Sequence, residues 1–230
     1  MSPANGQRLR EARRHAYENP RPEVQALVPA GARRVLDLGC SSGALGAALK
    51  VRQDCTVVGV ELEPVYAAAA RDRLDEVLEA DLADLAAAPD LEARLGRFDC
   101  LVAADVLEHL VDPWTALTRY AGLLEPGGVA VVSLPNVRYW ETFWQIGRHG
   151  TFPRRSEGIF DATHLRWFTL ADAHGLLGDA GLEVTAVWRQ MRLRPAINDP
   201  LWDRRIRVLE RTPLRPFLTF QHVLAARRRT

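Results

Sequence analysis

The sequence predicts a doubly wound α/β domain built on a mostly parallel sheet. Apolar, partly β-branched segments alternate with helical segments, which is the pattern of parallel strands joined by crossover helices. The first unit, residues 34–50, combines an apolar strand, a loop of small residues and a helix. A later segment, residues 129–134, is almost wholly apolar, as expected for a strand buried on both faces. The length of 230 residues and the hydrophobic fraction of 47% fit one such domain.

The loop after the first strand has the composition of a ligand cradle. Gly39 and Gly43 permit unusual backbone angles, and the helix that begins at Ala44 offers unpaired N–H groups. Asp37 would repel the pyrophosphate of a dinucleotide, but it suits the ammonium of S-adenosylmethionine (SAM). The spacing Asp-x-Gly-x-x-x-Gly also differs from the dinucleotide pattern Gly-x-Gly-x-x-Gly. We therefore expect SAM here; the alternative is a strand-to-helix turn without a ligand.

Residues 35–46 resemble the first motif of the class I, Rossmann-like SAM-dependent methyltransferases. That family usually has glycine where this chain has Ser41. The resemblance implies a seven-stranded sheet of order 3-2-1-4-5-7-6, with the last strand antiparallel and an aromatic-rich cap inserted. It also implies SAM as the cofactor.

Two further strands end in acids that would extend the cofactor site. The strand expected over residues 56–61 ends in Glu61, about twenty residues beyond the glycine loop, where an acid that binds ribose hydroxyls is expected. A helix should start at Pro64. The shorter strand 76–81 ends in Asp81, which resembles the family acid at the adenine amino group. Asp81 could also serve as the N-cap of the helical connection 83–96, which could break at Pro89.

The resemblance implies a cofactor site made of one N-terminal aromatic residue, the first loop and the tips of four strands: Tyr17, Asp37, Gly39, Cys40, Ser41, Gly43, Glu61, Leu62, Asp81, Leu82, Ala104 and Asp105. Tyr17 belongs to an N-terminal helical approach, residues 1–32. Packing on that helix is an equally good interpretation of Tyr17.

The fourth strand, residues 98–105, leads into a Leu-Glu-His segment that is also similar to the family. In this fold the carboxyl end of the strand lies over the methyl group. His109 is therefore a candidate general base, because an imidazole titrates near neutral pH. The alternative is that Glu108 and His109 only cap and orient the next helix, which should run from residue 112 to a Gly-Pro stop at 124–128.

Aromatic residues and arginines crowd into residues 137–168, and no periodic core pattern explains them. In the family this segment commonly forms a lid over the acceptor, and aromatic and guanidinium groups suit a ring or sugar with negative charge. A satellite hydrophobic cluster is the alternative. The candidate acceptor contacts are Asn136, Tyr139, Trp140, Arg166 and Trp167.

Residues 158–169 look like the Asp-x-x-His-Leu-Arg-aromatic-Phe-Thr signature of one bacterial branch of the family, often associated with polysaccharide, glycan or natural-product modification. Asp161 could orient His164 to give a pair that accepts a proton. Both residues could equally pin the cap. Thr169 is a suitable N-cap for a helix over 170–180.

The rest of the chain completes the expected domain. A sixth strand should cover residues 182–189, an insertion with a short helix at 202–211 should cover 191–216, and the last strand should cover 217–226. We expect a single domain over 1–230 that is a monomer or homodimer. The basic C-terminal region could attract an anion, but a solvated surface explains it better.

Composition and charge limit the classes of binding partner that are expected. The net charge of +1 gives no indication of nucleic-acid binding. Three cysteines without metal spacing argue against a disulfide framework, and no stretch has the apolar length of a membrane span, so a cytoplasmic location is expected. We expect no metal, although Asp105, Glu108 and His109 could converge by chance.

The expected reaction is transfer of a methyl group from SAM to a small or medium acceptor, which could be anionic. The first choice of acceptor is a hydroxyl of a sugar or of a glycosylated or natural-product metabolite. N-methylation of a small amine is the nearest alternative. A nicotinamide-dependent oxidoreductase and a non-catalytic SAM-binding module are the alternatives from other classes.

Overall fold

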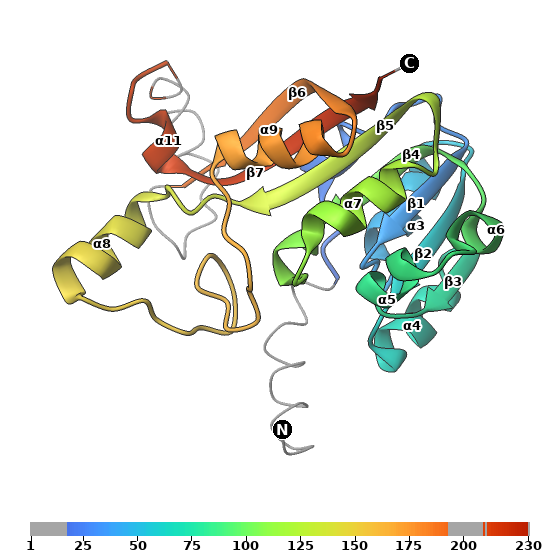
Figure 1. The fold of residues 1–230 in the computed structure, drawn as a ribbon, viewed down its shortest axis with the longest axis horizontal. Coiled ribbons are helices and arrows are strands. Elements are labelled where there is room, and N and C mark those ends of the chain that lie inside the picture. Colours follow the sequence, from blue (N-terminus) through green and yellow to red (C-terminus); the bar gives the residue numbers. More distant parts are fainter. Residues whose placement is uncertain (1–17, 193–208, 210, 230) are drawn as a thin grey trace.

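A computed structural model describes residues 18–192, 209 and 211–229, and it contains one seven-stranded sheet of order β3-β2-β1-β4-β5-β7-β6 (Figure 1). β1 to β5 pair in parallel, whereas β7 runs antiparallel to both β5 and β6. The expected strand order and the antiparallel last strand are therefore confirmed. The strands are β1 (Arg34–Leu38), β2 (Thr56–Glu61), β3 (Glu76–Glu79), β4 (Phe98–Ala104), β5 (Leu124–Pro135), β6 (Leu182–Met191) and β7 (Thr219–Arg228).

Helices cover both faces of this sheet (Figure 1). The described helices are α2 (Pro22–Gln25), α3 (Ala44–Arg52), α4 (Pro64–Arg71), α5 (Leu82–Ala87), α6 (Leu91–Leu95), the 3-10 helix η1 (Leu107–His109), α7 (Pro113–Ala121), α8 (Trp140–His149), α9 (Leu170–Asp179) and α11 (Arg215–Leu218). None of those helices is long and apolar enough to cross a bilayer.

Two apolar clusters form because alternate strand residues point to opposite faces. Leu36 and Leu101 pack with α5, α6, α7 and α9 on one face. Val35 and Val102 pack with α2, α3 and α4 on the other. Both faces of the sheet are therefore buried under helices, and the strand ends remain to carry a site.

The carboxyl ends of the parallel strands meet at one edge. Leu38 pairs with Val60 of β2 and with Ala103 of β4, and Glu61 pairs with Glu79 of β3. The residues that follow these strands therefore lie side by side. The cap, residues 137–168, follows β5 on the same side, and α8 lies within it (Figure 1).

Local differences from the expected elements concern strand and helix ends. The helical connection does break near Pro89, between α5 and α6. β5 starts at Leu124, so the predicted helix stop at 124–128 is wrong: Leu124 pairs with Phe98, and the register shifts before Cys100. The helix expected at 202–211 lies largely outside the described residues.

Candidate functional site

A cavity of about 700 Å³ opens at the carboxyl edge of the sheet, between the strand tips, the cap and β7. Such a crevice is where doubly wound sheets bind ligands. Most of the predicted cofactor and catalytic residues line it: Asp37, Gly39, Cys40, Ser41, Glu61, Leu62, Asp81, Leu82, Ala104, Asp105, His109, Asp161 and His164.

The loop after β1 depends on backbone conformations with positive φ. Gly39 has φ of 68°, and a Cβ there would lie 2.8 Å from Cγ2 of Val106. Ser41 has φ of 50°, which is costly for a residue with a side chain, and its buried Oγ has no hydrogen-bond partner among the described residues. The glycine usual at this place in the family would avoid both costs.

Glu61 fixes this loop from the tip of β2. Its Oε2 accepts a hydrogen bond from Ser41 N (2.8 Å), and its Oε1 accepts one from Glu63 N (2.9 Å). Each carboxylate oxygen has a second lone pair. Glu61 can therefore hold the loop and still accept hydrogen bonds from a ligand in the cavity.

Asp37 carries a carboxyl group that the protein leaves unsatisfied. Only 2% of the residue is exposed, and its Oδ2 has no hydrogen-bond partner in the described chain. Burial raises the pKa of Asp37 to about 7, the negative charge of Glu61 adds to this, and Arg21 opposes it. A cationic ligand group would supply the missing partner.

Asp81 and Asp105 have structural partners as well as cavity positions. Oδ1 of Asp81 accepts from Ala83 N (2.7 Å) and Asp84 N (3.2 Å), so this side chain caps α5. Asp105 forms an ion pair with Arg21, and its Oδ1 accepts hydrogen bonds from Ser133 Oγ and from the side-chain amide of Gln221. Its carboxylate is therefore already occupied.

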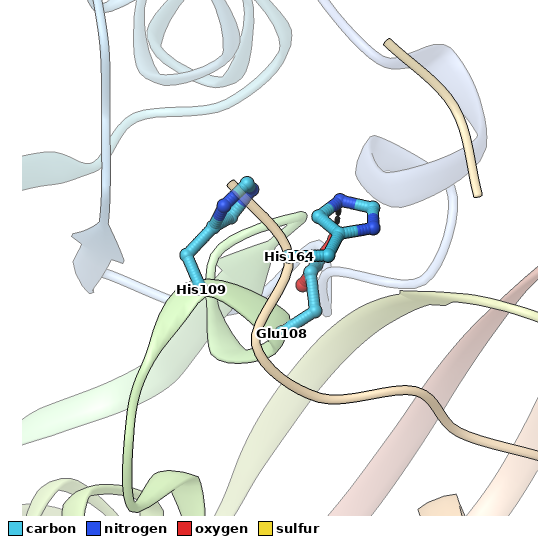
Figure 2. A group of neighbouring side chains, drawn as sticks. All are labelled: Glu108, His109 and His164. Atoms are coloured by element: carbon cyan, nitrogen blue, oxygen red, sulfur yellow. Dashed lines mark ion pairs between the residues drawn. The ribbon is translucent and has the colours of Figure 1, made fainter. Parts of the chain in front are cut away.

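A histidine pair and a buried glutamate lie together beside these acids (Figure 2). The rings of His109 and His164 are 4.8 Å apart between centroids, and Nε2 of His164 lies 3.8 Å from Oε1 of Glu108. Burial and the nearby His109 lower the pKa of His164. Burial raises the pKa of Glu108 well above its ordinary range.

The sequence pattern pairs Asp161 with His164, and the structure also places Glu108 next to that ring. The carboxyl group that lies beside the His164 ring is that of Glu108. Oδ1 of Asp161 accepts from Thr163 Oγ1 (2.7 Å), which in turn lies 3.0 Å from Nδ1 of His109. Asp161 thus reaches His109 through a threonine that the sequence analysis did not single out.

The five predicted acceptor contacts lie outside the cavity lining. The amide of Asn136 donates to the carbonyls of Pro216 (2.8 Å) and Thr219 (2.7 Å), which ties β5 to α11 and β7. Tyr139 is fully buried and packs on Trp140 and Phe220.

The other cap residues of this set also have internal partners. Arg166 donates to the carbonyls of Val111 and Leu165, and Trp167 donates to the carbonyl of Ile159. Gly43, at the N-cap of α3, likewise does not line the cavity, because it packs on α4. Tyr17 lies outside the described residues.

Sequence reasoning missed several polar residues that line the cavity. Arg21 comes from the segment before α2, Glu141 and Arg155 from the cap, and Arg192 from the end of β6. Arg155 pairs with Glu141 (2.6 Å). Arg192 lies 4.4 Å from the ring centroid of Phe220, and no carboxylate in the described chain forms an ion pair with it. No local motif marks these arginines.

Comparison with known proteins gives the chain's relatives. Residues 9–187, more than half of the chain, match the family described as a methyltransferase domain. A ubiquinone biosynthesis O-methyltransferase of Bradyrhizobium diazoefficiens is 36% identical over 141 residues, which are 59% of this chain and 51% of that protein. A trans-aconitate 2-methyltransferase of Methylobacterium radiotolerans is 39% identical over 124 residues, 51% of this chain and 44% of that protein. The matches thus span about half the length of these relatives.

Solved structures share the fold. A SAM-dependent methyltransferase of Thermotoga maritima, described as a possible histamine N-methyltransferase, has a TM-score of 0.64 at 18% identity and covers 98% of this chain and 95% of its own. The magnesium protoporphyrin IX methyltransferase of Synechocystis, solved with bound SAH, has a TM-score of 0.62 at 17% identity and covers 94% and 85%. Because the family match covers residues 9–187, the chain belongs to the methyltransferase-domain family.

Proposed function

We propose that this chain transfers the methyl group of SAM to a hydroxyl oxygen of a small or medium anionic acceptor. The observation that carries the proposal is that one cavity joins the acids at the tips of β1, β2 and β3 to the histidine pair beside β4. Cofactor-binding and proton-accepting groups therefore border the same space.

The part of the cavity lined by Asp37, Glu61 and Asp81, called the cofactor half here, fits SAM in charge and in hydrogen bonding. The unpartnered Oδ2 of Asp37 would accept from the ammonium, and the loop amides suit the carboxylate. The free lone pairs of Glu61 would accept from the ribose hydroxyls. Asp81 and Leu82 border the space that remains for adenine. Bound SAM supplies an electrophilic methyl group, so the protein's main task is to align the acceptor.

The part of the cavity near Arg192 and the histidine pair, called the acceptor half here, favours an anionic acceptor. The Arg192 guanidinium faces the cavity without an ion-pair partner in the described chain, and a carboxylate or phosphate of the acceptor would provide one. Positioning of this kind can supply about 7–11 kcal/mol of the barrier reduction. Glu108, His109 and His164 lie where the acceptor hydroxyl would be oriented and its proton removed, a contribution of about 10²–10⁴-fold.

Oxygen is preferred over nitrogen because the ubiquinone biosynthesis relatives are O-methyltransferases by name. The sugar or glycosylated acceptor suggested by the cap signature is one candidate class among several hydroxyl compounds. Hydroxylated aromatic acids, sugar phosphates and dicarboxylic acids all combine an oxygen nucleophile with negative charge.

The test measures incorporation of methyl-labelled SAM into these three acceptor classes, their uncharged analogues and small primary amines. We expect label in a hydroxylated anion. Arg192→Ala should raise the KM for that acceptor about tenfold or more and leave SAM affinity unchanged. Arg148→Ala, on the exposed surface of α8, is the matched control.

Three results would contradict the proposal. Label found only in amines would favour N-methylation. SAM binding without labelled product from any acceptor would favour a non-catalytic module. An equal increase in the acceptor KM with Arg148→Ala and Arg192→Ala would remove the argument for an anionic acceptor.

A further inference from the structure

Glu108, His109 and His164 form a compact group of two nitrogen ligands and one oxygen ligand. Each can offer one ligand atom such that all three lie within 4.8 Å of one another. Figure 2 shows Glu108 and His109 leaving the same short helix, η1, while His164 reaches them from the cap. Two segments more than fifty residues apart are thus brought to one point.

The hydrogen bonds of the two histidines indicate which ring nitrogen carries the hydrogen. Nδ1 of His164 lies 3.3 Å from the carbonyl oxygen of Ile159, and Nδ1 of His109 lies 3.2 Å from that of Thr163. A carbonyl only accepts, so each Nδ1 carries the hydrogen and each Nε2 keeps its lone pair. Histidines that bind metals are typically fixed in this way by a carbonyl or carboxylate.

Glu108 and His164 face one another with acceptor atoms in this tautomer. Nε2 of His164 faces Oε1 of Glu108 at 3.8 Å, and both atoms carry lone pairs in this tautomer. Oε2 of Glu108 is buried, the residue is only 1% exposed, and no hydrogen-bond donor in the described chain reaches that atom. A buried carboxylate oxygen without a donor is costly, and a cation bound beside Glu108 would satisfy it.

We propose that Glu108, His109 and His164 bind one divalent transition-metal ion. Two imidazoles and one carboxylate suit zinc and its first-row neighbours better than magnesium or calcium, which prefer all-oxygen sites. Bonds of about 2.0–2.2 Å place neighbouring ligand atoms about 3–3.5 Å apart, so side-chain rotations of about 1 Å would close the site. From the sequence we expect no metal and only a chance convergence of Asp105 with Glu108 and His109. In the structure Arg21, Ser133 and Gln221 occupy the Asp105 carboxylate.

Glu108, His109 and His164 all line the cavity, so an ion held by these three ligands would have room for a further ligand, as in catalytic zinc sites. An acceptor oxygen could bind there. That role rests on the proposed function, whereas binding of the metal itself does not.

The test titrates zinc alone into chelator-treated protein, without SAM or acceptor, by calorimetry. We expect one ion per chain and much weaker binding of magnesium. Glu108→Gln and His109→Ala should each weaken zinc binding about 100-fold or more, and Thr163→Val, which removes a bond to a ligand, about 10–100-fold. His174→Ala, an exposed histidine on α9, is the matched control and should bind zinc normally.

Circular dichroism shows which variants fold. If Glu108→Gln does not fold, His109→Ala still tests the site, because His109 is half-exposed and its replacement should disturb the fold less. No stoichiometric zinc binding, or an equal loss with His174→Ala, would overturn the site. Methyl transfer by protein that does not bind zinc would overturn the site and leave the proposed function intact. Stoichiometric zinc binding without methyl transfer to any acceptor would support the metal site and overturn the proposed function.

Discussion

Asp37 is a buried carboxyl whose ionisation should control SAM affinity. Burial and the charge of Glu61 raise its pKa to about 7, so the group is largely protonated below pH 7. The protonated form attracts an ammonium less strongly. We predict that SAM affinity falls as the pH decreases below 7, by up to about tenfold per unit. Calorimetric titrations with SAM between pH 5.5 and 8.5 measure this slope.

The same pKa has the opposite effect on the stability of the protein without SAM. Between about pH 4 and 7 the folded state binds the proton and the unfolded state does not, so the free energy of unfolding decreases as the pH rises. Asp37→Asn removes the buried charge. It should stabilise the protein at pH 8 by a few kcal/mol at most, of order 1–4, and weaken SAM binding at that pH. A variant that binds SAM with an unchanged pH profile would refute the ammonium assignment.

Ser41 offers a test of backbone strain. Its φ of 50° and its unpartnered buried Oγ both disfavour serine at this position. We predict that Ser41→Gly raises the free energy of unfolding by about 1 kcal/mol and keeps SAM affinity within about twofold. Urea unfolding measures the first quantity. Ser41→Ala removes only the hydroxyl, so a gain from alanine equal to that from glycine would exclude strain as the cause.

At the residue scale, the sequence placed the acids at the tips of successive strands, whereas their roles toward a cofactor stay predictions. Asp37, Glu61 and Asp81 all line the same cavity as expected. The partners of Asp161 and His164 were not predictable, because Glu108 reaches His164 from a segment more than fifty residues away. Spacing within one motif carries no information on such contacts.

At the scale of elements, the start of α9 was predictable from the local sequence alone, because Thr169 is a suitable N-cap residue. Thr169 accepts from Asp172 N, and Oδ2 of Asp172 accepts from Thr169 N, which completes a capping box. We predict that Thr169→Ala lowers the free energy of unfolding by about 1 kcal/mol and leaves SAM affinity unchanged. Urea unfolding and SAM titration on the same sample test both statements. A loss of SAM affinity would mean that α9 also shapes the cavity.

The start of β5 shows where local signals fail. The Gly-rich segment 124–128 has the composition of a helix stop, but Leu124 pairs with Phe98 and extends the sheet. The cap has a comparable non-local tie, since the carbonyl of Glu108 accepts from Leu165 N (2.9 Å) and Arg166 N (3.0 Å). Pairing with a distant strand or loop overrides composition in both places.

At the scale of the whole molecule, the resemblance supplied the strand order, which composition and periodicity alone could not. Arg155 belongs to the arginines of the cap that the sequence analysis associated with a charged acceptor, whereas Arg192 came only from the folded arrangement. The cap and the end of β6 bring them to the cavity from sequence-distant positions. The strand-tip residues around Asp37, Glu61 and Asp81 could thus be placed together from motifs, whereas the position of Arg192 required the structure.

The cavity is lined by residues from several strand ends, the cap and β7, so a ligand bound there should stabilise the whole fold. A ligand bound only by the folded state, at a free concentration 100 times its Kd, raises the free energy of unfolding by about 2.7 kcal/mol. We predict a shift of this size with SAM, because Asp37, Glu61 and Asp81 favour its cationic and hydroxyl groups. NADH should give no shift, since its pyrophosphate would meet these acids. Urea unfolding at matched concentrations of the two ligands separates the cases, and stabilisation by NADH without stabilisation by SAM would favour an oxidoreductase instead.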